Sequence, residues 1–521
     1  MDAKFNFFKS FKTNPVLGIT FDDILLVPEY TEINSRGDCD VSTLLSRNVP
    51  LKIPIVSSPM DSVTEYKMAL ELARNGGIGI VHRYQSIEDQ AKTIRKIKKA
   101  ENIFITDPFI VDEEESVDNL ISISEYIEKR SFLVSSYKVD LSKIPSDMRE
   151  FKSSVTKVSP GDHFELKGII TARDMRAAQK KGSKVKDVMT PREKLTVFVQ
   201  KAGTKLESND TKELYRIMLD HRIEKLPLVD DKNIIIGLVT EKDISKSLGV
   251  NTANVDPKGK LYVGCAVGCR DDYLERADEL VNAGANVIIV DIANGHNVSN
   301  FKAIDELKSR FKGVDVIGGN VATADGARRH IEHGVDSLRV GLGNGSICST
   351  RLVSGCGVPQ VTALLDVLTE ADQHKIPVIS DGGIRTSGAM AKALAVGASS
   401  VMLGSMLAGT EESPGLPFLK DGTFVKIHRG MAGFGANMSK AERIKGAGAE
   451  PNSMSFTPEG VEGFVPYKGP LKANVHQMVM GIKSGMSYVG AKNLKEFRDM
   501  SHFTLTSISG IVEGGISVNK I

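Results

Sequence analysis

Residues 376–409, IPVISDGGIRTSGAMAKALAVGASSVMLGSMLAG, contain two copies of one structural unit. In each copy a short apolar run, IPVIS at 376–380 or SSVML at 399–403, leads directly into a glycine-containing turn. An alanine-rich segment with helical spacing joins the two runs. Buried parallel strands have continuous apolar sequences, and helices are their usual connections. This stretch therefore predicts strand–helix units in a parallel sheet.

The same unit recurs along most of the chain. Six further apolar runs end in Gly, Ser, Asp or Asn before a helical stretch: IPIVSSPMD (53–61), GGIGIVHR (76–83), LYVGCAVG (261–268), ANVIIVDIANG (285–295), VDVIGGNVAT (314–323) and DSLRVGLGNGS (336–346). Eight such units favour an α/β fold of the (β/α)8 TIM-barrel type over an open sheet. In that fold the chemistry takes place at the carboxyl ends of the strands.

A different module interrupts the repeat at residues 103–250, between barrel segments 1–102 and 251–521. It contains two similar phrases, GIITARDM (168–175) and GLVTEKDI (237–244), which predict a tandem pair of strand–helix modules. The insert resembles a pair of CBS modules, and that resemblance implies purine-nucleotide binding with Asp174 and Asp243 at the ribose. The alternative is a structural or oligomer-contact insert without a ligand, because the first copy is poorly formed.

Composition excludes several functional classes. Lys and Arg total 67 against 65 Asp and Glu, and Trp is absent, so no bulk positive field or aromatic platform favours nucleic acid. No apolar run reaches the roughly 18 residues of a membrane span. The start, MDAKFNFFKSFKTNP, lacks the apolar core of a signal peptide. The five cysteines are expected to be reduced thiols, and we expect a cytoplasmic location.

The segment GLGNGSICSTRLVSGCGVPQ (341–360) has the clearest chemical pattern. Its first three glycines let the backbone turn sharply after a strand and expose N–H groups. Ser346 is placed to bind an anion, and Cys348 stands two residues before Thr350. A cysteine thiolate is a strong nucleophile, and N–H groups at a helix start lower its pKa. The alternative is a buried cysteine beside a tight turn.

Two glycine-containing loops follow the seventh and eighth strands, SDGGIRTSG (380–388) and LGSMLAGT (403–410). Loops at these positions of a (β/α)8 barrel often bind phosphate through backbone N–H groups. Asp381 is a candidate for holding ribose hydroxyls. The candidate phosphate ligands are Gly383, Gly404 and Ser405, together with Ser346 of the cysteine loop.

Over nearly its whole length the chain resembles the IMP dehydrogenase/GMP reductase family. The matching phrases also include GITFDDILLVP (18–28), IPIVSSPMDSVTE (53–65), RGMAGFGAN (429–437) and PEGVEGFVPYKGPL (458–471). The resemblance implies a purine-nucleotide oxidoreductase in which Cys348 attacks C2 of the base to form a covalent thioimidate. It also implies that Thr350 and Glu459 form a proton relay, although Glu459 read alone is equally a solvated loop carboxylate.

The resemblance further implies ligand contacts. Asp291 would contact the nicotinamide ribose, Asn320 would line the base pocket, and Met431 and Gly433 would lie at the purine edge. The expected cofactor set is Asp291, Gly341 and Gly343. The backbone carbonyls of Gly343, Gly345 and Cys348 would bind a monovalent cation such as K+, joined by Glu513, Gly514 and Gly515 of a neighbouring subunit. The family commonly forms tetramers, with octamers through CBS contacts.

The two reactions of the family differ in one step. A dehydrogenase must hydrolyse its thioimidate and needs a base to activate water. In the family this base is an Arg of an Arg-Tyr pair ahead of the PEGVEG phrase. Here residues 438–457, MSKAERIKGAGAEPNSMSFT, contain Arg443 followed by Ile444 and no such pair. A reductase expels ammonia from GMP and does not use the water step.

Other phrases divide between the two reactions. Three phrases resemble those of CBS-containing GMP reductases: VDIANG (290–295), HRY (82–84) and RGMAGFGANMSKAER (429–443). Two features are instead typical of the dehydrogenases, namely VEGG (512–515) and the insert itself. Phe456 also replaces an Arg that short GMP reductases carry. We predict a GMP reductase that uses NADPH. The alternatives are an IMP dehydrogenase that uses NAD, with Arg443 as water activator, and, more remotely, a non-catalytic nucleotide sensor.

Overall fold

The computed structural model describes residues 17–100, 104–105, 107–127, 130–137, 154–158, 162–178, 182–200, 210–241, 244, 252–445 and 458–515. The chain divides into two compact units, Met1–Ala100 with Thr252–Ile521, and Glu101–Asn251. Both junctions lie within two residues of those expected from the sequence. No helix among these described residues is long and apolar enough to cross a membrane.

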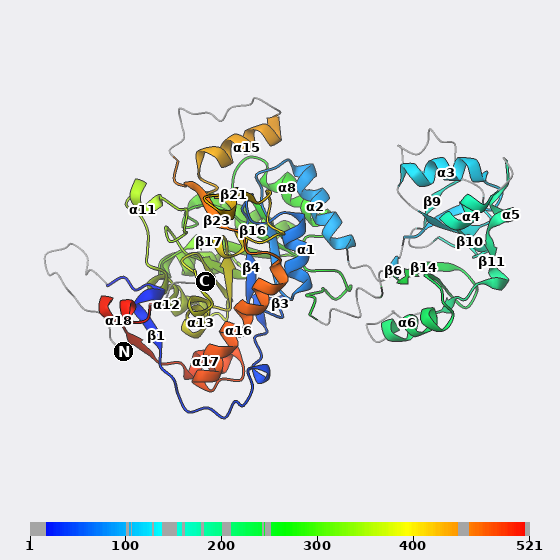
Figure 1. Ribbon diagram of the computed structural model, residues 1–521. Coiled ribbons are helices and arrows are strands. Elements are labelled where there is room, and N and C mark those ends of the chain that lie inside the picture. The colour runs from blue at the N-terminus through cyan, green and yellow to red at the C-terminus, as the bar shows by residue number, and fades with distance from the viewer. Residues whose placement is uncertain are drawn as a thin grey trace. The chain divides into compact units, whose positions relative to one another are not determined.

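The first unit is built on a closed barrel of eight parallel strands (Figure 1). The strands follow one another around the ring as β15-β16-β17-β18-β19-β20-β4-β5. They are β4 (Ile55–Ser57), β5 (Ile78–Val81), β15 (Gly264–Val267), β16 (Val287–Val290), β17 (Asp315–Val321), β18 (Ser337–Val340), β19 (Val378–Asp381) and β20 (Ser400–Leu403). Each comes from one of the eight apolar runs, so the predicted TIM barrel is confirmed.

Helices follow the strands in the order that the sequence predicts. They are α1 (Tyr66–Arg74), α2 (Ile87–Lys99), α8 (Tyr273–Asn282), α9 (Val298–Arg310), α10 (Ala324–Glu332), α11 (Thr350–Val353), α12 (Gln360–Ala371), α13 (Ser387–Val396) and α14 (Ser405–Ala408). Side-chain caps define several starts: the Thr323 and Thr386 hydroxyls accept the N–H groups of Gly326 and Ala389 at 3.2 and 3.1 Å. Such caps stabilise a helix by about 1 kcal/mol each.

A hairpin packs against the side chains that fill the barrel. β2 (Thr43–Ser46) and β3 (Val49–Leu51) pair antiparallel. Leu45, Val49 and Leu51 from this hairpin belong to the same buried cluster as inward-facing residues of the barrel strands, among them Ile289 and Ile379. Because this apolar cluster fills the barrel, there is no central pore, and polar chemistry is confined to the strand ends.

The segments after β20 add structure around the barrel. A three-stranded antiparallel sheet consists of β21 (Phe418–Lys420), β22 (Thr423–Arg429) and β23 (Glu462–Pro466). α15 (Phe434–Lys445) lies between β22 and β23 in the chain. α16 (Leu471–Val489), α17 (Leu494–Met500) and α18 (Ile508–Glu513) follow, and β24 (Phe503–Leu505) pairs with the N-terminal β1 (Ile24–Leu26).

The second unit contains two small sheets, each with its own apolar core. One has the order β11-β10-β8-β7-β9 and the other β12-β13-β14-β6. The strands are β6 (Phe104–Ile105), β7 (Phe109–Asp112), β8 (Ser131–Ser135), β9 (Thr156–Lys157), β10 (Gly168–Thr171), β11 (Thr190–Pro191), β12 (Phe198–Val199), β13 (Lys225–Val229) and β14 (Ile235–Thr240). The helices are α3 (Val117–Tyr126), α4 (Ala172–Ala177), α5 (Val185–Val188) and α6 (Asp210–Asp220).

The two repeated phrases occupy β10 with α4 and β14. The Asp174 carboxylate accepts the backbone N–H and the hydroxyl of Thr171 at 2.8 and 2.7 Å, which caps α4. Asp243 lies outside the described residues. The CBS identity of this unit and the nucleotide-binding role of these aspartates stay predictions.

One buried histidine makes the stability of the barrel unit depend on pH. His330 of α10 is fully buried; its Nδ1 donates to the Gly326 carbonyl at 2.6 Å and its Nε2 accepts from the Asn300 amide at 2.9 Å. Burial lowers the pKa of His330 from 6.5 to about 4. The unfolded chain therefore binds the proton first as pH falls, so acid destabilises the fold between these two values.

We predict that the free energy of unfolding falls by roughly 1.4 kcal/mol per pH unit for this group between about pH 6.5 and pH 4. Urea unfolding of the wild type and of His330→Gln, followed across that range, should show a weaker pH dependence in the variant. The matched control is His502→Gln, because His502 is largely exposed. Equal slopes for all three proteins would contradict the assignment.

Candidate active site

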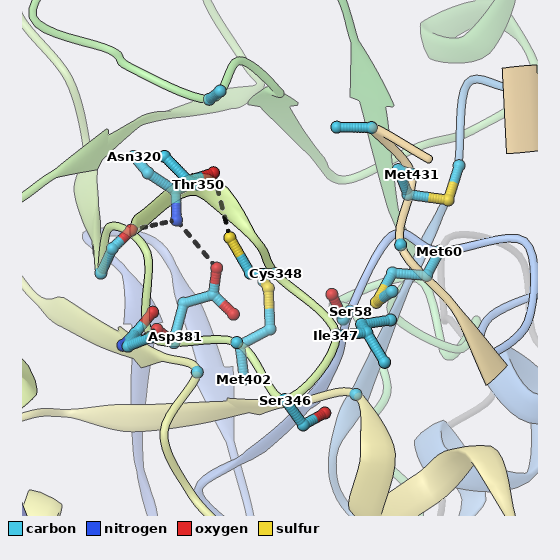
Figure 2. A pocket seen from close by; sticks show the side chains of 18 of the residues that line it. Ser58, Met60, Asn320, Ser346, Ile347, Cys348, Thr350, Asp381, Met402 and Met431 are labelled. Atoms are coloured by element: carbon cyan, nitrogen blue, oxygen red, sulfur yellow. Dashed lines mark hydrogen bonds between the residues drawn. The ribbon is translucent and has the colours of Figure 1, made fainter. Parts of the chain in front are cut away.

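One pocket, with a volume of about 350 Å3, lies at the carboxyl ends of the barrel strands (Figure 2). Residues that follow six of the eight strands line it, together with Asn320 near the end of β17, so the site lies where a (β/α)8 barrel places its chemistry. The predicted site residues in its wall are Asp291, Asn320, Gly341, Gly343, Gly345, Ser346, Cys348, Thr350, Asp381, Gly383, Gly404, Ser405, Met431 and Glu459. Gly433 is buried outside this wall, and Glu513, Gly514 and Gly515 lie exposed at the end of α18.

A hydrogen-bonded chain leads from the candidate nucleophile to a carboxylate. The Cys348 thiol donates to Thr350 Oγ1 at 3.1 Å, and that hydroxyl donates to Glu459 Oε2 at 2.8 Å. Figure 2 shows the Thr350–Cys348 contact inside the pocket. A thiol proton can therefore reach a carboxylate through one hydroxyl. Glu459 is part of the pocket wall rather than a solvated loop residue.

The backbone brings Glu459 to the cysteine loop, 109 residues away along the chain. The Ser349 N–H donates to the Glu459 carbonyl and the Val461 N–H donates to the Ile347 carbonyl, both at 3.0 Å. On its other side the same segment pairs with residues 430–432, again through 3.0 Å hydrogen bonds. Residues 459–461 therefore form the middle of three hydrogen-bonded segments.

Two glycines allow this close approach. A Cβ on Gly460 would lie 3.1 Å from the Gly430 Cα and 3.1 Å from the Gly433 nitrogen. A Cβ on Gly430 would lie 3.0 Å from the Gly460 Cα. Because all these neighbours are backbone atoms, a side chain at either position would separate the segments. Gly433, predicted at the purine edge, thus helps to pack the segment that holds Glu459.

The candidate phosphate loops converge on the same pocket. Gly382 and Gly383 adopt φ values of +85° and +74°, which side chains disfavour. The Asn344 amide donates to the Asp381 carbonyl at 3.0 Å, so it ties the cysteine loop to the loop after β19. Gly404 caps α14, and its backbone turns the chain at the end of β20. Backbone groups of these loops and the Ser405 hydroxyl line the cavity.

One buried arginine links the two candidate ribose-binding carboxylates. Arg339 of β18 donates from Nε to Asp381 Oδ2 and from Nη1 to Asp291 Oδ1, each at 2.8 Å. Asn320 donates to the same Asp381 oxygen at 2.9 Å and to the Gly341 carbonyl at 2.7 Å (Figure 2). Burial opposes the charge of Arg339, but the two carboxylates raise the pKa of its guanidinium. Both carboxylates are thereby held in fixed orientations.

The sequence analysis did not identify Arg339, although a signal for it was present. A charged residue stands inside the otherwise apolar strand SLRV at 337–340, and a buried charge is expected to have a partner. The structure identifies those partners as two aspartates from other strand ends. The sequence analysis likewise did not single out Asn344.

Arg443, the alternative water activator, lies outside the pocket wall. Its Nη1 donates to Glu65 Oε1 at 3.0 Å, and Glu65 also lies 3.5 Å from the Nε2 of buried His82. Burial raises the pKa of Glu65, but its contacts with His82 and Arg443 outweigh that effect and lower it. In this arrangement Arg443 anchors α15 to the residue that precedes α1.

Residues 18–516 match the IMP dehydrogenase / GMP reductase domain. The chain belongs to the IMP dehydrogenase/GMP reductase family. The resemblance that the sequence motifs indicated is confirmed. As a member of this family the chain is an oxidoreductase of purine metabolism, and the family uses nicotinamide dinucleotide cofactors.

Relatives in the family carry both names. Inosine-5'-monophosphate dehydrogenase from Nitrosopumilus maritimus is 42% identical over 497 residues, which cover 95% of this chain and 97% of the relative. GMP reductase from Leishmania donovani is 41% identical over 504 residues, 96% of each chain. A crystal structure of a Cys-to-Ala variant of Trypanosoma brucei GMP reductase with guanosine 5'-monophosphate has a TM-score of 0.81 and 39% identity, covering 97% of this chain and 98% of that one.

The Gly430–Gly460 contact predicts a sensitive position. We expect Gly460→Ala to lower turnover by about ten-fold or more, because the added Cβ displaces Glu459 from Thr350 and weakens a transition-state contact. The matched control is Gly463→Ala, since nothing lies within 4 Å of a Cβ at that position. Steady-state rates and thermal unfolding of both variants would test this. Wild-type turnover in Gly460→Ala would show that the spacing does not matter.

Proposed function

We propose that this protein is a GMP reductase, which converts GMP and NADPH to IMP, ammonia and NADP+ through a covalent thioimidate on Cys348. The observation that carries the proposal is the Cys348–Thr350–Glu459 chain in a family-defining pocket whose wall does not include Arg443. That chain can move protons between the sulfur and the departing amino group. Because Arg443, the candidate water activator, is not among the described residues of that wall, the thioimidate would persist until hydride arrives.

The proton steps follow from the geometry. The thiol proton passes to Thr350 and the Thr350 proton to Glu459, which leaves the thiolate free to add to C2 of the purine. The same chain then returns a proton to the 2-amino group, and the C2–N bond breaks to release ammonia and leave the thioimidate. A bound reduced nicotinamide supplies hydride to C2. The C2–S bond then breaks, and Cys348 leaves as the thiolate.

The pocket offers contacts for both substrates. Asp381 would hold the ribose hydroxyls of the purine nucleotide, while Ser346, Ser405 and the backbone at Gly383 and Gly404 would hold its phosphate. Asn320 and Met431 would border the base. Asp291 would hold the nicotinamide ribose, with Gly341 and Gly343 beside the ring. The T. brucei relative that was crystallised with guanosine 5'-monophosphate supports a purine nucleoside monophosphate as substrate.

The dehydrogenase reaction is the second candidate because many relatives carry that name. It requires a base that activates water at the thioimidate. Residues 444–457 contain no arginine, and Arg443 donates to Glu65. These two observations favour the reductase.

Further features of the family are proposed on resemblance alone. Residues 101–251 would form a tandem CBS pair that binds purine nucleotides. The carbonyls of Gly343, Gly345 and Cys348 would bind K+ together with Glu513, Gly514 and Gly515 of a neighbouring subunit in a tetramer. Gly345 and Cys348 already lie in one turn, since the Cys348 N–H donates to the Gly345 carbonyl at 3.1 Å.

One assay separates the two reactions. The purified protein is supplied either with GMP and NADPH or with IMP and NAD, and absorbance at the nicotinamide band is followed while purine products are separated by chromatography. We expect NADPH oxidation with stoichiometric IMP and ammonia. Accumulation of XMP from IMP, without turnover of GMP, would establish the dehydrogenase instead.

Replacement of the relay carboxylate should affect the two half-reactions unequally. We predict that Glu459→Gln slows release of ammonia from GMP by about 100-fold or more, the usual scale of general acid–base catalysis. Hydride exchange between IMP and the oxidised cofactor should be slowed less, because no amine has to be protonated. Pre-steady-state kinetics in each direction measure the two effects. Cys348→Ala, the control, should abolish both reactions while nucleotide binding is kept; equal losses in Glu459→Gln would argue against the relay.

A further inference from the structure

Two cations lie over the ring of Tyr84, and both Tyr84 and Arg83 belong to the pocket wall. In the barrel order β5, which precedes these two residues, is the neighbour of β15, and β15 and β16 lie across the ring from β19 and β20. Arg83 follows β5, and its guanidinium carbon lies 5.3 Å from the ring centroid of Tyr84. Lys440 of α15 places its ammonium 5.2 Å from the same centroid. The Tyr84 ring therefore contacts two positively charged side chains, one from the first barrel segment and one from the second.

These charges have weak partners or none. Arg83 Nε is buried without a hydrogen bond; it lies 3.6 Å from Asp291 Oδ2, a carboxylate that already accepts from Arg339. Arg83 Nη2 makes one long hydrogen bond, to the Asp291 carbonyl at 3.4 Å. Lys440 makes no hydrogen bond or ion pair with any residue in the described part of the chain. Arg276, the third cation nearby, differs because Asp272 pairs with it at 2.6 Å. Arg83 and Lys440 thus remain available to a ligand.

The electrostatics of the pair favour an anion. Burial, together with the neighbouring charges of Arg83 and Arg276, lowers the pKa of Lys440 more than Asp272 and Asp271 raise it. Like charges in a partly desolvated site repel each other, and an anion bound beside them relieves that repulsion. A phosphate presents several acceptor oxygens and suits both a guanidinium fork and an ammonium. The site therefore fits a phosphate better than a neutral group.

The position of the pair indicates which phosphate it would bind. The phosphate of the purine nucleotide has its own loops after β19 and β20. Asp291, the candidate ligand of the nicotinamide ribose, is the residue that Arg83 contacts. A dinucleotide bound through that ribose carries its bridging pyrophosphate, and in NADPH also a 2'-phosphate, further from the reacting carbon.

We propose that Arg83 and Lys440 bind a phosphate group of the dinucleotide cofactor, which makes α15 part of the cofactor site. This inference rests on the proposed function only in taking a nicotinamide dinucleotide as the second substrate. It assigns α15 a role in binding the cofactor. Arg443, three residues further along α15, then serves to anchor this helix through Glu65.

The test replaces Lys440 by Met, which keeps the length of the aliphatic chain and removes the charge. With GMP saturating, KM for the cofactor should rise by about ten-fold or more while kcat changes little, as expected for loss of a charged phosphate contact. The dissociation constant of NADPH, measured without GMP by titration of nicotinamide fluorescence, should rise by the same factor. A rise for NADPH alone identifies the 2'-phosphate, and a rise for NADPH and NADH alike identifies the pyrophosphate. Lys440→Arg should restore most of the affinity.

Lys420→Met is the matched control, because Lys420 also places its ammonium over an aromatic ring, 3.7 Å from the Phe464 centroid, and Phe464, unlike Tyr84, is not part of the pocket wall. It should leave both cofactor KM values unchanged. The proposal is overturned if Lys440→Met behaves like this control, or if it raises KM for GMP instead. Unchanged KM for GMP also shows that the variant is folded.

The reaction direction is checked separately on the wild type. If the enzyme oxidises IMP and does not reduce GMP, the proposed function fails, and the same KM comparison is made with IMP saturating and NAD or NADP+ varied. The proposed phosphate site is then judged by the change in KM for NAD or NADP+ alone, independently of the reaction direction.

Discussion

The close contact between Gly430 and Gly460 is the constraint on which the candidate chemistry depends. Only a pair without side chains lets residues 459–461 hydrogen-bond the cysteine loop on one side and residues 430–432 on the other. This pairing presents Glu459 to Thr350 at 2.8 Å, and so connects a thiol at a barrel strand end with a carboxylate from a distant segment. The candidate nucleophile comes from a barrel loop, whereas the carboxylate that would accept its proton comes from the segment just before β23.

Much of the fold could be predicted from the sequence because the barrel has a strong local signature. Each buried parallel strand is a short apolar run, and each run leads through a turn residue to an amphipathic helix, as at 376–409. That signal repeats eight times and identifies the strand ends that line the pocket. The inserted unit interrupts the repeat clearly enough to be delimited. Its ligand, if it binds one, depends on side-chain geometry that the repeated phrases do not specify, and Asp243 is outside the described residues.

The contacts within the candidate site were less predictable from the sequence than the fold, because they join residues that are distant along the chain. Residues such as Cys348, Ser346 and Asp381 stand in loops directly after strands, so their position in the barrel follows from the strand order. Glu459 was placed by family resemblance, because no local pattern indicates a contact with Thr350. The Arg339 bridge between Asp291 and Asp381 depends on which strand ends face each other across the ring. Local patterns predict elements; contacts between elements require the three-dimensional arrangement.

The same arrangement bears on how one fold supports either of two reactions. The proposed thioimidate on Cys348 would have two fates, attack by water or attack by hydride, and the chain would influence their ratio through the side chains that it places near C2. The segment between β22 and β23 carries α15. In this chain α15 is held through the Arg443–Glu65 pair, and Lys440 stands over Tyr84, a residue of the pocket wall. An exposed ion pair contributes little by itself, about 1 kcal/mol at most. The placement of α15 therefore depends on the sum of modest contacts such as Arg443–Glu65 and Lys440–Tyr84, and neither of these two contacts involves Cys348. α15 would thus influence the ratio of the two fates through its position and not through a direct contact with the sulfur.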